Sequence, residues 1–336
     1  MRILLIQTAF IGDAILATAL LEKLHYHFPD AQLDLLVRKG NEMLFKGHPF
    51  LNNVLIWNKE KGKYRSLWTL LTTIRQRRYD RVINLQRYGS TGVLTAFSGA
   101  WETIGFDKNP FARFFTHRVV HRIQPGVHEV DRNTDLVRFF TDETVFRPRL
   151  YPPNRVPHQS TDGSYVCIAP TSVWFTKQFP ESQWIAFINA LPPNLTVYLL
   201  GGPGDVHACE TIRQACIGQR VVENRAGKLG LLESAALMRD AVLNYVNDSA
   251  PMHLCSAVNA PTCAVFCSTV PGFGYGPLAD FARIVDIEEP LYCRPCGLHG
   301  HEACPEGHFR CALDIRIIQL LDVLKERLRQ QKTSQL

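Results

Sequence analysis

The sequence predicts an α/β protein of two Rossmann-like domains, each with a parallel sheet covered by helices. Short apolar segments alternate with helical patterns along most of the chain, which is the order found in strand–helix–strand units. The alternation stops in a Pro-rich polar stretch, residues 147–163, and then starts again. The chain has 336 residues, of which 46% are hydrophobic and 20% charged, a composition and length typical of two globular domains.

The first domain, residues 1–155, begins with a short apolar run that is followed at once by an apolar helical pattern. Strands are predicted, in chain order, at residues 2–8, 33–37, 54–57 and 81–85. Helices are predicted at residues 13–28, 64–78 and 130–140, the second of them amphipathic. The first apolar run resembles the core of a signal peptide, but Asp13 interrupts it and no cleavage site precedes the helix. We therefore expect a buried strand and a cytoplasmic protein.

The second domain, residues 163–312, repeats the pattern, and residues 313–336 form a closing helix. Strands are predicted at residues 165–169, 196–200, 241–246 and 262–266. Helices are predicted at residues 181–190, 205–216, 231–239, 251–258 and 314–329. Because ligands of parallel sheets bind at the carboxyl ends of the strands, we expect the two domains to face each other across a cleft.

The stretch VNDSAPMH, residues 246–253, is the most informative part of the chain. It joins a predicted buried strand to a predicted helix through a polar turn. Ser249 suits the N-cap position and Pro251 the first helical turn. Free backbone amides at the start of such a helix form a site for a phosphate group.

A second polar turn follows the first predicted strand and contains Gly12 and Asp13. It has one glycine, so the three-glycine fingerprint of dinucleotide-binding proteins is absent, which argues against a nicotinamide-dependent oxidoreductase. Asp13 has two interpretations. It is either a simple N-cap favoured by the helix dipole or a general base at the end of the strand.

Two further turns complete the candidate site. Thr171 and Ser172 end the first strand of the second domain, and Lys177 follows in a short loop, within reach of a phosphate bound there. The turn Gly201-Gly202-Pro203-Gly204-Asp205 allows close backbone approach and places Asp205 to meet a ribose hydroxyl, although this signal is weak by itself.

Taken together, these motifs resemble glycosyltransferase family 9, the heptosyltransferases of lipopolysaccharide core synthesis, over nearly the whole chain. The resemblance is carried by GDAILAT at residues 12–18, by Thr171-Ser172 with TKQFP at residues 176–180, by the Gly201-Gly202-Pro203 turn and by NDSAPMH at residues 247–253. It implies a GT-B fold with an N-terminal acceptor domain and a C-terminal nucleotide-sugar domain. It also implies inverting transfer without a catalytic metal, from ADP-heptose to a lipopolysaccharide or lipooligosaccharide core.

The resemblance also implies roles for individual residues. Asp13 matches the family's proposed base, and Lys177, Asp248 and His253 match residues that hold the donor. The family usually has Gly at the position of Ala250 and often Trp at that of Phe179. We expect Asp13 and Lys177 to be catalytic. The expected donor-binding residues are Gly12, Thr171, Ser172, Lys177, Gly202, Asp205, Asp248, Ser249, Ala250 and His253.

Charge is divided unevenly between the two halves. Residues 1–160 contain 23 Lys and Arg against 14 Asp and Glu, a balance of +9, whereas residues 161–336 contain 14 against 17, a balance of −3. The basic half either is a solvated surface or meets an anionic glycolipid acceptor at the inner face of the inner membrane. The candidate contacts are Lys59, Lys61, Lys63, Arg65, Arg75, Arg77 and Arg78. We find no nucleic-acid-binding motif.

A Cys-rich tail segment, residues 293–311, contains Cys293, Cys296, Cys304 and Cys311, with three histidines among them. The spacing is compatible with a structural zinc ion, with an iron–sulfur cluster, or with cysteines that only pack a loop, and these alternatives stay open.

Two other functions fit parts of the sequence. One is a related transferase that uses a different nucleotide sugar and surface-glycan acceptor, and the other is a zinc-ribbon protein that binds nucleic acid. The zinc-ribbon function is disfavoured, because two parallel-sheet domains are a much larger scaffold than a zinc ribbon needs.

Overall fold

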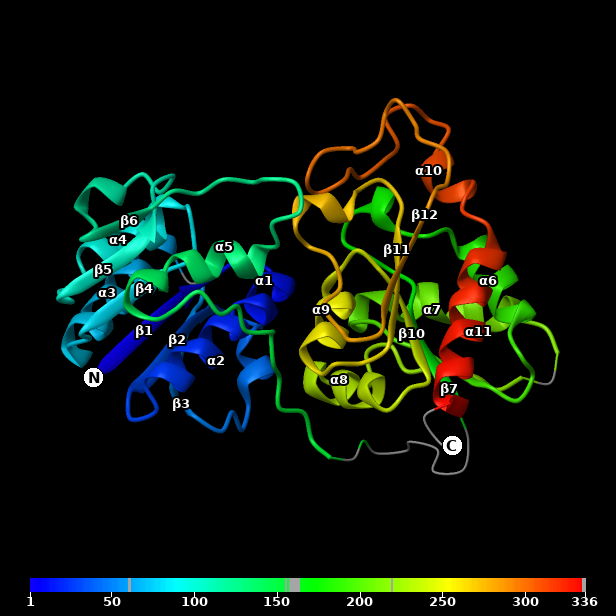
Figure 1. Ribbon diagram of the computed structural model, residues 1–336, viewed down its shortest axis with the longest axis horizontal. Helices are drawn as coiled ribbons and strands as arrows, with labels where there is room; N and C mark the ends of the chain where they lie inside the picture. Colours follow the sequence, from blue (N-terminus) through cyan, green and yellow to red (C-terminus); the bar gives the residue numbers. More distant parts are fainter. Residues whose placement is uncertain (60–61, 155, 157–163, 219, 334–336) are drawn as a thin grey trace. The chain divides into compact units, whose positions relative to one another are not determined.

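The computed structural model describes residues 1–59, 62–154, 156, 164–218 and 220–333, and the chain divides into two compact units, Met1–Tyr151 and Pro152–Leu336 (Figure 1). Within the described residues, each unit contains one six-stranded sheet in which all neighbouring strands are parallel. The predicted α/β class with two parallel sheets is therefore confirmed.

The first unit alternates strands with helices from its first residues. Its strands are β1 (Arg2–Gln7), β2 (Gln32–Arg38), β3 (Leu51–Trp57), β4 (Arg81–Asn84), β5 (Glu102–Phe106) and β6 (His117–Val119). Its helices are α1 (Ile11–Leu16), α2 (Thr18–His27), α3 (Lys63–Arg77), α4 (Gly89–Ala96) and α5 (Glu129–Asp135), with 3₁₀ turns η1 (Glu42–Phe45), η2 (Ala112–Phe114) and η3 (Arg138–Phe140). Helix α2 lies beside α5, and α3 lies beside α4.

The second unit repeats this alternation. Its strands are β7 (Tyr165–Ala169), β8 (Thr196–Leu199), β9 (Val222–Asn224), β10 (Leu243–Asn247), β11 (Thr262–Phe266) and β12 (Ala282–Asp286). Its helices are α6 (Glu181–Ala190), α7 (Val206–Ala215), α8 (Leu231–Arg239), α9 (Ala250–Ala257), α10 (Arg310–Leu313) and α11 (Ile317–Thr333), with 3₁₀ turns η4 (Phe175–Lys177), η5 (Pro203–Asp205) and η6 (Pro271–Phe273). None of the helices described here has both the length and the apolar character needed to cross a membrane.

The two sheets have the same strand order. In the first unit it is β3-β2-β1-β4-β5-β6, and in the second, read from the other edge, it is β9-β8-β7-β10-β11-β12. In each sheet the order therefore reverses once, between β1 and β4 and between β7 and β10. Ligands of such sheets bind beyond the carboxyl ends of the strands at the point of reversal. The turns after these four strands are thus the places where the fold favours a site.

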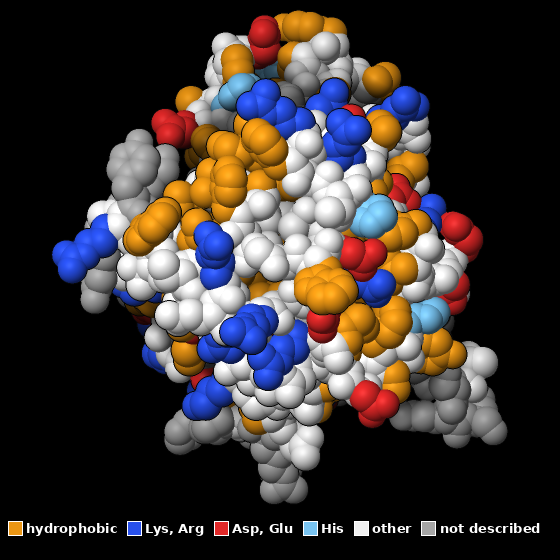
Figure 2. All heavy atoms as spheres, turned by 90° about the vertical axis from the view of Figure 1, so that its left-hand side faces the viewer, with side chains coloured by type: hydrophobic (Ala, Val, Ile, Leu, Met, Phe, Trp, Pro, Cys, Tyr) orange, Lys and Arg blue, Asp and Glu red, His pale blue; other side chains and the backbone are white. Residues whose placement is uncertain are grey.

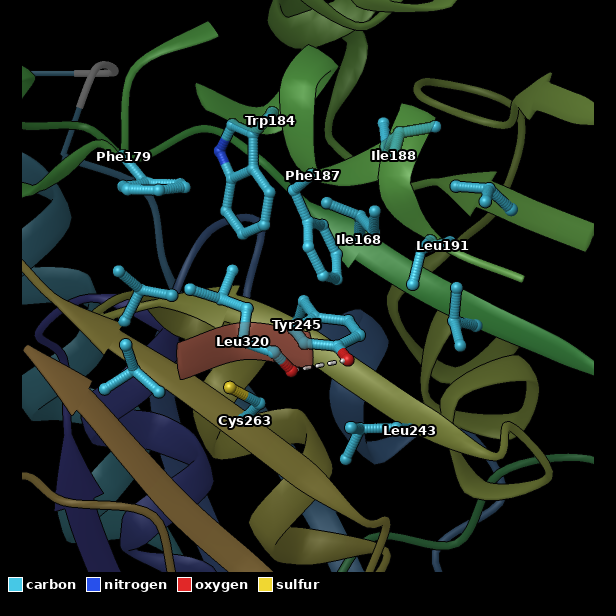
Figure 3. Packing of buried hydrophobic residues seen from close by; sticks show 14 of the residues in the cluster. Ile168, Phe179, Trp184, Phe187, Ile188, Leu191, Leu243, Tyr245, Cys263 and Leu320 are labelled. Carbon is cyan, nitrogen blue, oxygen red and sulfur yellow. Dashed lines mark hydrogen bonds between the residues drawn. The ribbon is translucent and has the colours of Figure 1, made fainter. Parts of the chain in front are cut away.

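The core of the second unit is built around aromatic rings that meet edge to face (Figure 3). Phe179 meets Trp184 of α6 edge-on at 5.0 Å between ring centroids, and Phe187 meets Tyr245 of β10 at 4.5 Å. The hydroxyl of Tyr245 donates a hydrogen bond of 3.2 Å to the carbonyl of Leu320 in α11. These rings are almost fully buried, and each contributes a large hydrophobic area. Phe179 therefore anchors the end of the β7–α6 loop in the core.

Two predicted helices are shorter than expected. The pattern over residues 13–28 is divided into α1 and α2 at Ala17, and that over residues 130–140 into α5 and η3. The Thr18 hydroxyl explains the first division, because it donates a 2.6 Å hydrogen bond to the Ile15 carbonyl and accepts one of 2.8 Å from the Arg149 amide. Such bonds compete with the helix's own hydrogen bonds and bend it.

Several strands and helices were not predicted, namely β5, β6, β9, β12, α4 and α10. The strands β6 and β9 have three residues each, which is too short for an alternating pattern to be visible.

The beginning of the predicted linker packs against the first unit. The Tyr151 hydroxyl donates a 2.8 Å hydrogen bond to the carboxylate of Glu22 in α2. Within the linker, residue 155 and residues 157–163 lie outside the described residues.

Candidate functional site

A buried asparagine joins the ends of the two strands at the reversal point of the second sheet. Asn247, the last residue of β10, has no exposed surface. Its side-chain nitrogen donates to the carbonyls of Pro170 at 2.8 Å and Thr171 at 3.4 Å, and its side-chain oxygen accepts from the amide of Phe179 at 3.0 Å. One amide group therefore fixes both ends of the β7–α6 loop.

That loop brings Lys177 to the residue that follows Asn247. The Nζ atom of Lys177 lies 2.6 Å from Oδ2 of Asp248, and both side chains are largely buried. The hydroxyl of Thr269, after β11, donates to the same carboxylate oxygen at 2.7 Å. An ammonium group has three hydrogens to donate, so Lys177 can bind Asp248 and still donate to a second acidic group. The sequence predicts Lys177 and Asp248 as two separate donor-binding residues, and the fold brings them together as an ion pair.

Helix α9 begins directly after this pair. Ser249 occupies the N-cap position with extended backbone and Pro251 lies in the first turn, as predicted. The Ser249 side chain does not cap the helix: its hydroxyl lies 3.5 Å from the carbonyl of Asn247. Ala250 is the first helical residue, and His253 is buried one turn further on. The start of α9 therefore presents backbone amides beside the Lys177–Asp248 pair, an arrangement that suits a phosphate.

The other donor-site residues predicted from the sequence lie on the neighbouring turns. Thr171 and Ser172 are half-buried, and the Ser172 carbonyl accepts a 2.7 Å hydrogen bond from the side chain of Gln178. In the turn after β8, one carboxylate oxygen of Asp205 accepts from the amide of Gly202 at 2.7 Å. Asp205 thus closes its own turn, while its contact with a ribose stays a prediction.

Asp13 lies at the reversal point of the first sheet, in the first turn of α1 after β1. The N-cap of α1 is Phe10, so the interpretation of Asp13 as an N-cap is wrong, and Gly12 is the helical residue before it. Burial, followed by the nearby carboxylate of Glu129, raises the pKa of Asp13 from 3.8 to about 6. Hydrogen bonds from the amides of Phe10 and Asp13 and the charge of Arg87 act in the opposite direction. A carboxylate tuned toward neutral pH is suited to accept a proton.

The surroundings of Asp13 contain further buried polar groups. Glu129, at the start of α5, is bound by the guanidinium group of Arg132, with Nη2 and Oε2 2.8 Å apart. The hydroxyl of Thr8 and the side-chain nitrogen of Asn84, at the ends of β1 and β4, are buried and form no hydrogen bond with the residues that the structure describes. Buried polar atoms without partners are costly and often mark a ligand site.

All four cysteines of the tail segment are free thiols. Cys311 is buried in α10, which raises its pKa to about 12, and Sγ of Cys293 lies 3.8 Å from Nε2 of His308. In the part of the chain that the structure describes, no group of three or more His, Cys, Asp or Glu residues is arranged to hold a metal ion. The zinc and iron–sulfur hypotheses stay untested predictions.

Sequence reasoning missed four residues that shape the two sites: Asn247 as the loop clamp, Thr269, Glu129 and Arg87. Asn247 was part of the predicted motif, and its place at the end of a buried strand was the signal that an amide there must bind backbone. Nothing in the sequence around Thr269, Glu129 or Arg87 indicates a role in either site. The fold brings these residues to the sites from distant parts of the chain.

A family comparison covers most of the chain. The model of glycosyltransferase family 9 (heptosyltransferase) matches residues 67–302. This range contains the loop with Lys177 and the start of α9.

Individual relatives cover the chain more fully. The lipopolysaccharide heptosyltransferase 3 of Escherichia coli is 28% identical over 77% of this chain and 82% of its own length. The lipopolysaccharide heptosyltransferase 1 of Pseudomonas aeruginosa is 26% identical over 88% and 86%. The solved structure of the E. coli ADP-heptose lipopolysaccharide heptosyltransferase II has a TM-score of 0.80 at 20% identity and covers 99% of this chain and 100% of that one. This likeness confirms the predicted GT-B fold.

The raised pKa of Asp13 predicts a pH-dependent cost to stability. Because the folded pKa of about 6 exceeds the ordinary 3.8, the native state is favoured by this group below pH 4 and loses that stability as the pH rises through 6. We expect Asp13→Asn to raise the free energy of unfolding at pH 7.5 by on the order of 2 kcal/mol, and to change it little at pH 4. Urea denaturation at both pH values measures the difference.

The exposed carboxylate of Asp30 offers a matched control. Asp30→Asn should leave the unfolding free energy within about 0.5 kcal/mol of the wild type at both pH values. If the effect of Asp13→Asn were the same at pH 4 and pH 7.5, the carboxylate would not be desolvated as described.

Proposed function

The chain belongs to glycosyltransferase family 9, and on this basis we propose that it transfers a heptose from ADP-heptose to a lipopolysaccharide or lipooligosaccharide core, with inversion at the anomeric carbon. The main support is the Lys177–Asp248 pair beside the start of α9, at the point where the second sheet reverses its strand order. Similarity to lipopolysaccharide heptosyltransferases, one of them described as using ADP-heptose, supports the choice of donor and acceptor.

The second unit would bind the donor. The diphosphate would lie between Lys177 and the first amides of α9, with the hydroxyls of Thr171 and Ser172 near it. Lys177 can reach it without leaving Asp248, and Asp248 fixes the direction of the ammonium group. Gly202, Asp205 and His253 would complete the donor site as the sequence predicted, with Asp205 reaching the ribose through the carboxylate oxygen that does not hold Gly202.

Charge on the leaving ADP would be stabilised by fixed groups of the protein. Negative charge builds on the diphosphate as the glycosidic bond breaks, and preorganised positive groups lower the barrier most where that charge develops. Lys177 and the partial positive charge at the start of α9 are such groups. We assign this role to them and not to a metal ion.

Asp13 would act as the general base. The acceptor hydroxyl loses its proton as it attacks the anomeric carbon, and a carboxylate with a pKa near 6 is ionised at neutral pH but still basic enough to take that proton. The buried polar atoms of Thr8 and Asn84 beside this turn support a ligand at the same place. The first unit would accordingly hold the acceptor.

The surface of the first unit is suited to an anionic acceptor. Figure 2 shows a group of Lys and Arg side chains on its face, with hydrophobic side chains nearby. A groove of about 490 Å³ lies between the end of β3 and α3 and is lined in part by Trp57, Arg65 and Thr69. The end of β3 is two strands from that of β1, about 10 Å away along the same sheet edge. A phosphorylated glycolipid at the inner face of the inner membrane would fit this surface.

One of the predicted acceptor contacts, Arg77, has an ion-pair partner within the first unit. The guanidinium group of Arg77 lies 2.9 Å from Oδ2 of the buried Asp34, which Asn53 and Tyr79 also bind. Arg77 is thus committed to a structural network inside the unit. Arg65, Arg75 and Arg78 are exposed, whereas Lys61 and the side chain of Lys63 lie outside the described residues.

Nucleotide preference tests the donor. We expect ADP to raise the melting temperature of the wild-type protein more than UDP, GDP or CDP at equal concentration, since at a given concentration a ligand of lower Kd stabilises the native state more. A thermal-shift series with the four nucleotides measures this. Equal or larger shifts with a pyrimidine or guanine nucleotide would replace ADP-heptose by another donor while leaving the fold and family unchanged.

The general base is tested by kinetics. Asp13→Asn should lower kcat by at least about 100-fold, because general-base catalysis contributes roughly 10²–10⁴ in rate, and should leave the Kd for ADP within about twofold. Lys177→Ala is the contrasting variant, since loss of its ammonium group should weaken ADP binding as well as slow transfer. Retention of more than about a tenth of wild-type kcat by Asp13→Asn would remove Asp13 from the mechanism.

The acceptor surface is tested by charge reversal. The double variant Arg65→Glu/Arg75→Glu should raise KM for the acceptor, leave KM for the donor unchanged, and reduce the effect of salt on acceptor KM, because screening acts on exposed charges. The matched control is Arg329→Glu/Lys332→Glu, which reverses two exposed charges on α11 of the second unit. Equal effects of both double variants would mean that net charge, and not this surface, attracts the acceptor.

A further inference from the structure

The tail segment, residues 293–311, is hydrogen-bonded to the loop that carries Lys177. The amide of His301 donates to the hydroxyl of Thr176 at 2.8 Å, and the amide of Thr176 donates to the carbonyl of His301 at 3.1 Å. The Thr176 hydroxyl donates in turn to the His301 carbonyl at 3.2 Å and accepts from the Ser268 hydroxyl at 3.0 Å. Thr176 is almost fully buried, so this hydroxyl uses its full bonding capacity inside the protein.

The tail segment also contacts the residues that adjoin Asp248, the acidic member of the ion pair. The amide of Cys296 donates to the Ser268 carbonyl at 2.8 Å. The guanidinium group of Arg294 donates to the Thr269 carbonyl at 2.8 Å and to the Phe266 carbonyl at 3.3 Å. Thr269 is the residue whose hydroxyl binds Asp248. The tail segment is therefore bonded to the residue before Lys177 and to the residue that fixes Asp248.

We propose that the tail segment is a positioning element of the donor site, which sets the place of Lys177 against Asp248 through the Thr176–His301 and Arg294–Thr269 hydrogen bonds. The inference rests on the proposed donor site in the second unit. Loss of these bonds would let the ammonium group and the carboxylate move apart. Even small misplacements of a binding group weaken its contact with a ligand strongly.

A substitution at Gly300 tests the contact between the tail segment and the Lys177 loop. Gly300 has φ +74°, and a Cβ atom added to it would lie 2.8 Å from the Thr176 hydroxyl oxygen, 3.1 Å from Cγ of Lys177 and 3.2 Å from the Ser268 hydroxyl oxygen. Gly307, in the same segment, has φ +73° and no atom within 4 Å of an added Cβ. Gly300→Ala and Gly307→Ala thus both place an L side chain at a positive φ of similar size, and only the first pushes the tail segment away from Lys177.

The first measurement does not depend on the nucleotide. Hydrogen exchange of the intact protein, followed by mass spectrometry, should show faster exchange in peptides that cover residues 174–179 and 266–270 for Gly300→Ala, and wild-type exchange there for Gly307→Ala. Equal exchange in the two variants would overturn the proposal, whatever ligand the site binds. Thr176→Val should behave as Gly300→Ala does, and Thr176→Ser, which keeps the hydroxyl, should restore wild-type exchange.

The second measurement tests whether the contact between the tail segment and the Lys177 loop affects nucleotide binding. The Kd for ADP by calorimetry should rise at least about tenfold in Gly300→Ala and Thr176→Val, and less than about threefold in Gly307→Ala and Thr176→Ser. Equal Kd values in all four variants, with a wild type that binds ADP, would overturn the positioning role. If the wild type bound none of the four nucleotides, the proposed donor would be wrong, and the exchange result alone would decide whether the tail segment positions Lys177.

Discussion

The amide group of Asn247 is the interaction on which the candidate donor site depends. It is fully buried and uses both its donor and its acceptor for backbone groups at the two ends of the β7–α6 loop. Between these ends the chain has no regular element longer than the 3₁₀ turn η4. A loop of this kind gains its fixed shape from such side-chain bonds, because a buried polar group left without a partner is costly. The clamp fixes the two ends of the loop that carries Thr176 and Lys177.

Charge is arranged differently at the two reversal points. In the second sheet, Lys177 and Asp248 are buried together, so each partly offsets the cost of burying the other. In the first sheet, Asp13 lies near Glu129, and burial and this neighbour together raise its pKa to about 6. The first arrangement favours a fixed cation beside an anionic ligand. The second favours a carboxylate that exchanges a proton near neutral pH, at the expense of native-state stability.

The tail segment shows how a surface-exposed, irregular stretch becomes part of a site. Its backbone is bonded to Thr176 and Ser268, and the Arg294 side chain is bonded to Thr269. These three residues adjoin or bind the two members of the ion pair. Gly300 permits this approach, since a side chain there would meet Thr176 and Lys177. The cysteine thiols, which make the segment conspicuous in the sequence, do not form these contacts; backbone amides, one carbonyl and the Arg294 side chain form them.

The sequence by itself determined the α/β class, the central strands, the turns that follow β1, β7 and β10, and the residues of those turns, because apolar runs and turn residues are local signals. It did not reveal the edge strands β6 and β9, which have three residues each, or the division of the first helix by Thr18. Only the tertiary structure decided that Lys177 is paired with Asp248, that Arg77 is paired with Asp34, and that burial and the nearby Glu129 raise the pKa of Asp13. The physical reason is that these effects join residues tens to more than a hundred positions apart, and folding alone sets the distances on which charge and hydrogen bonding depend.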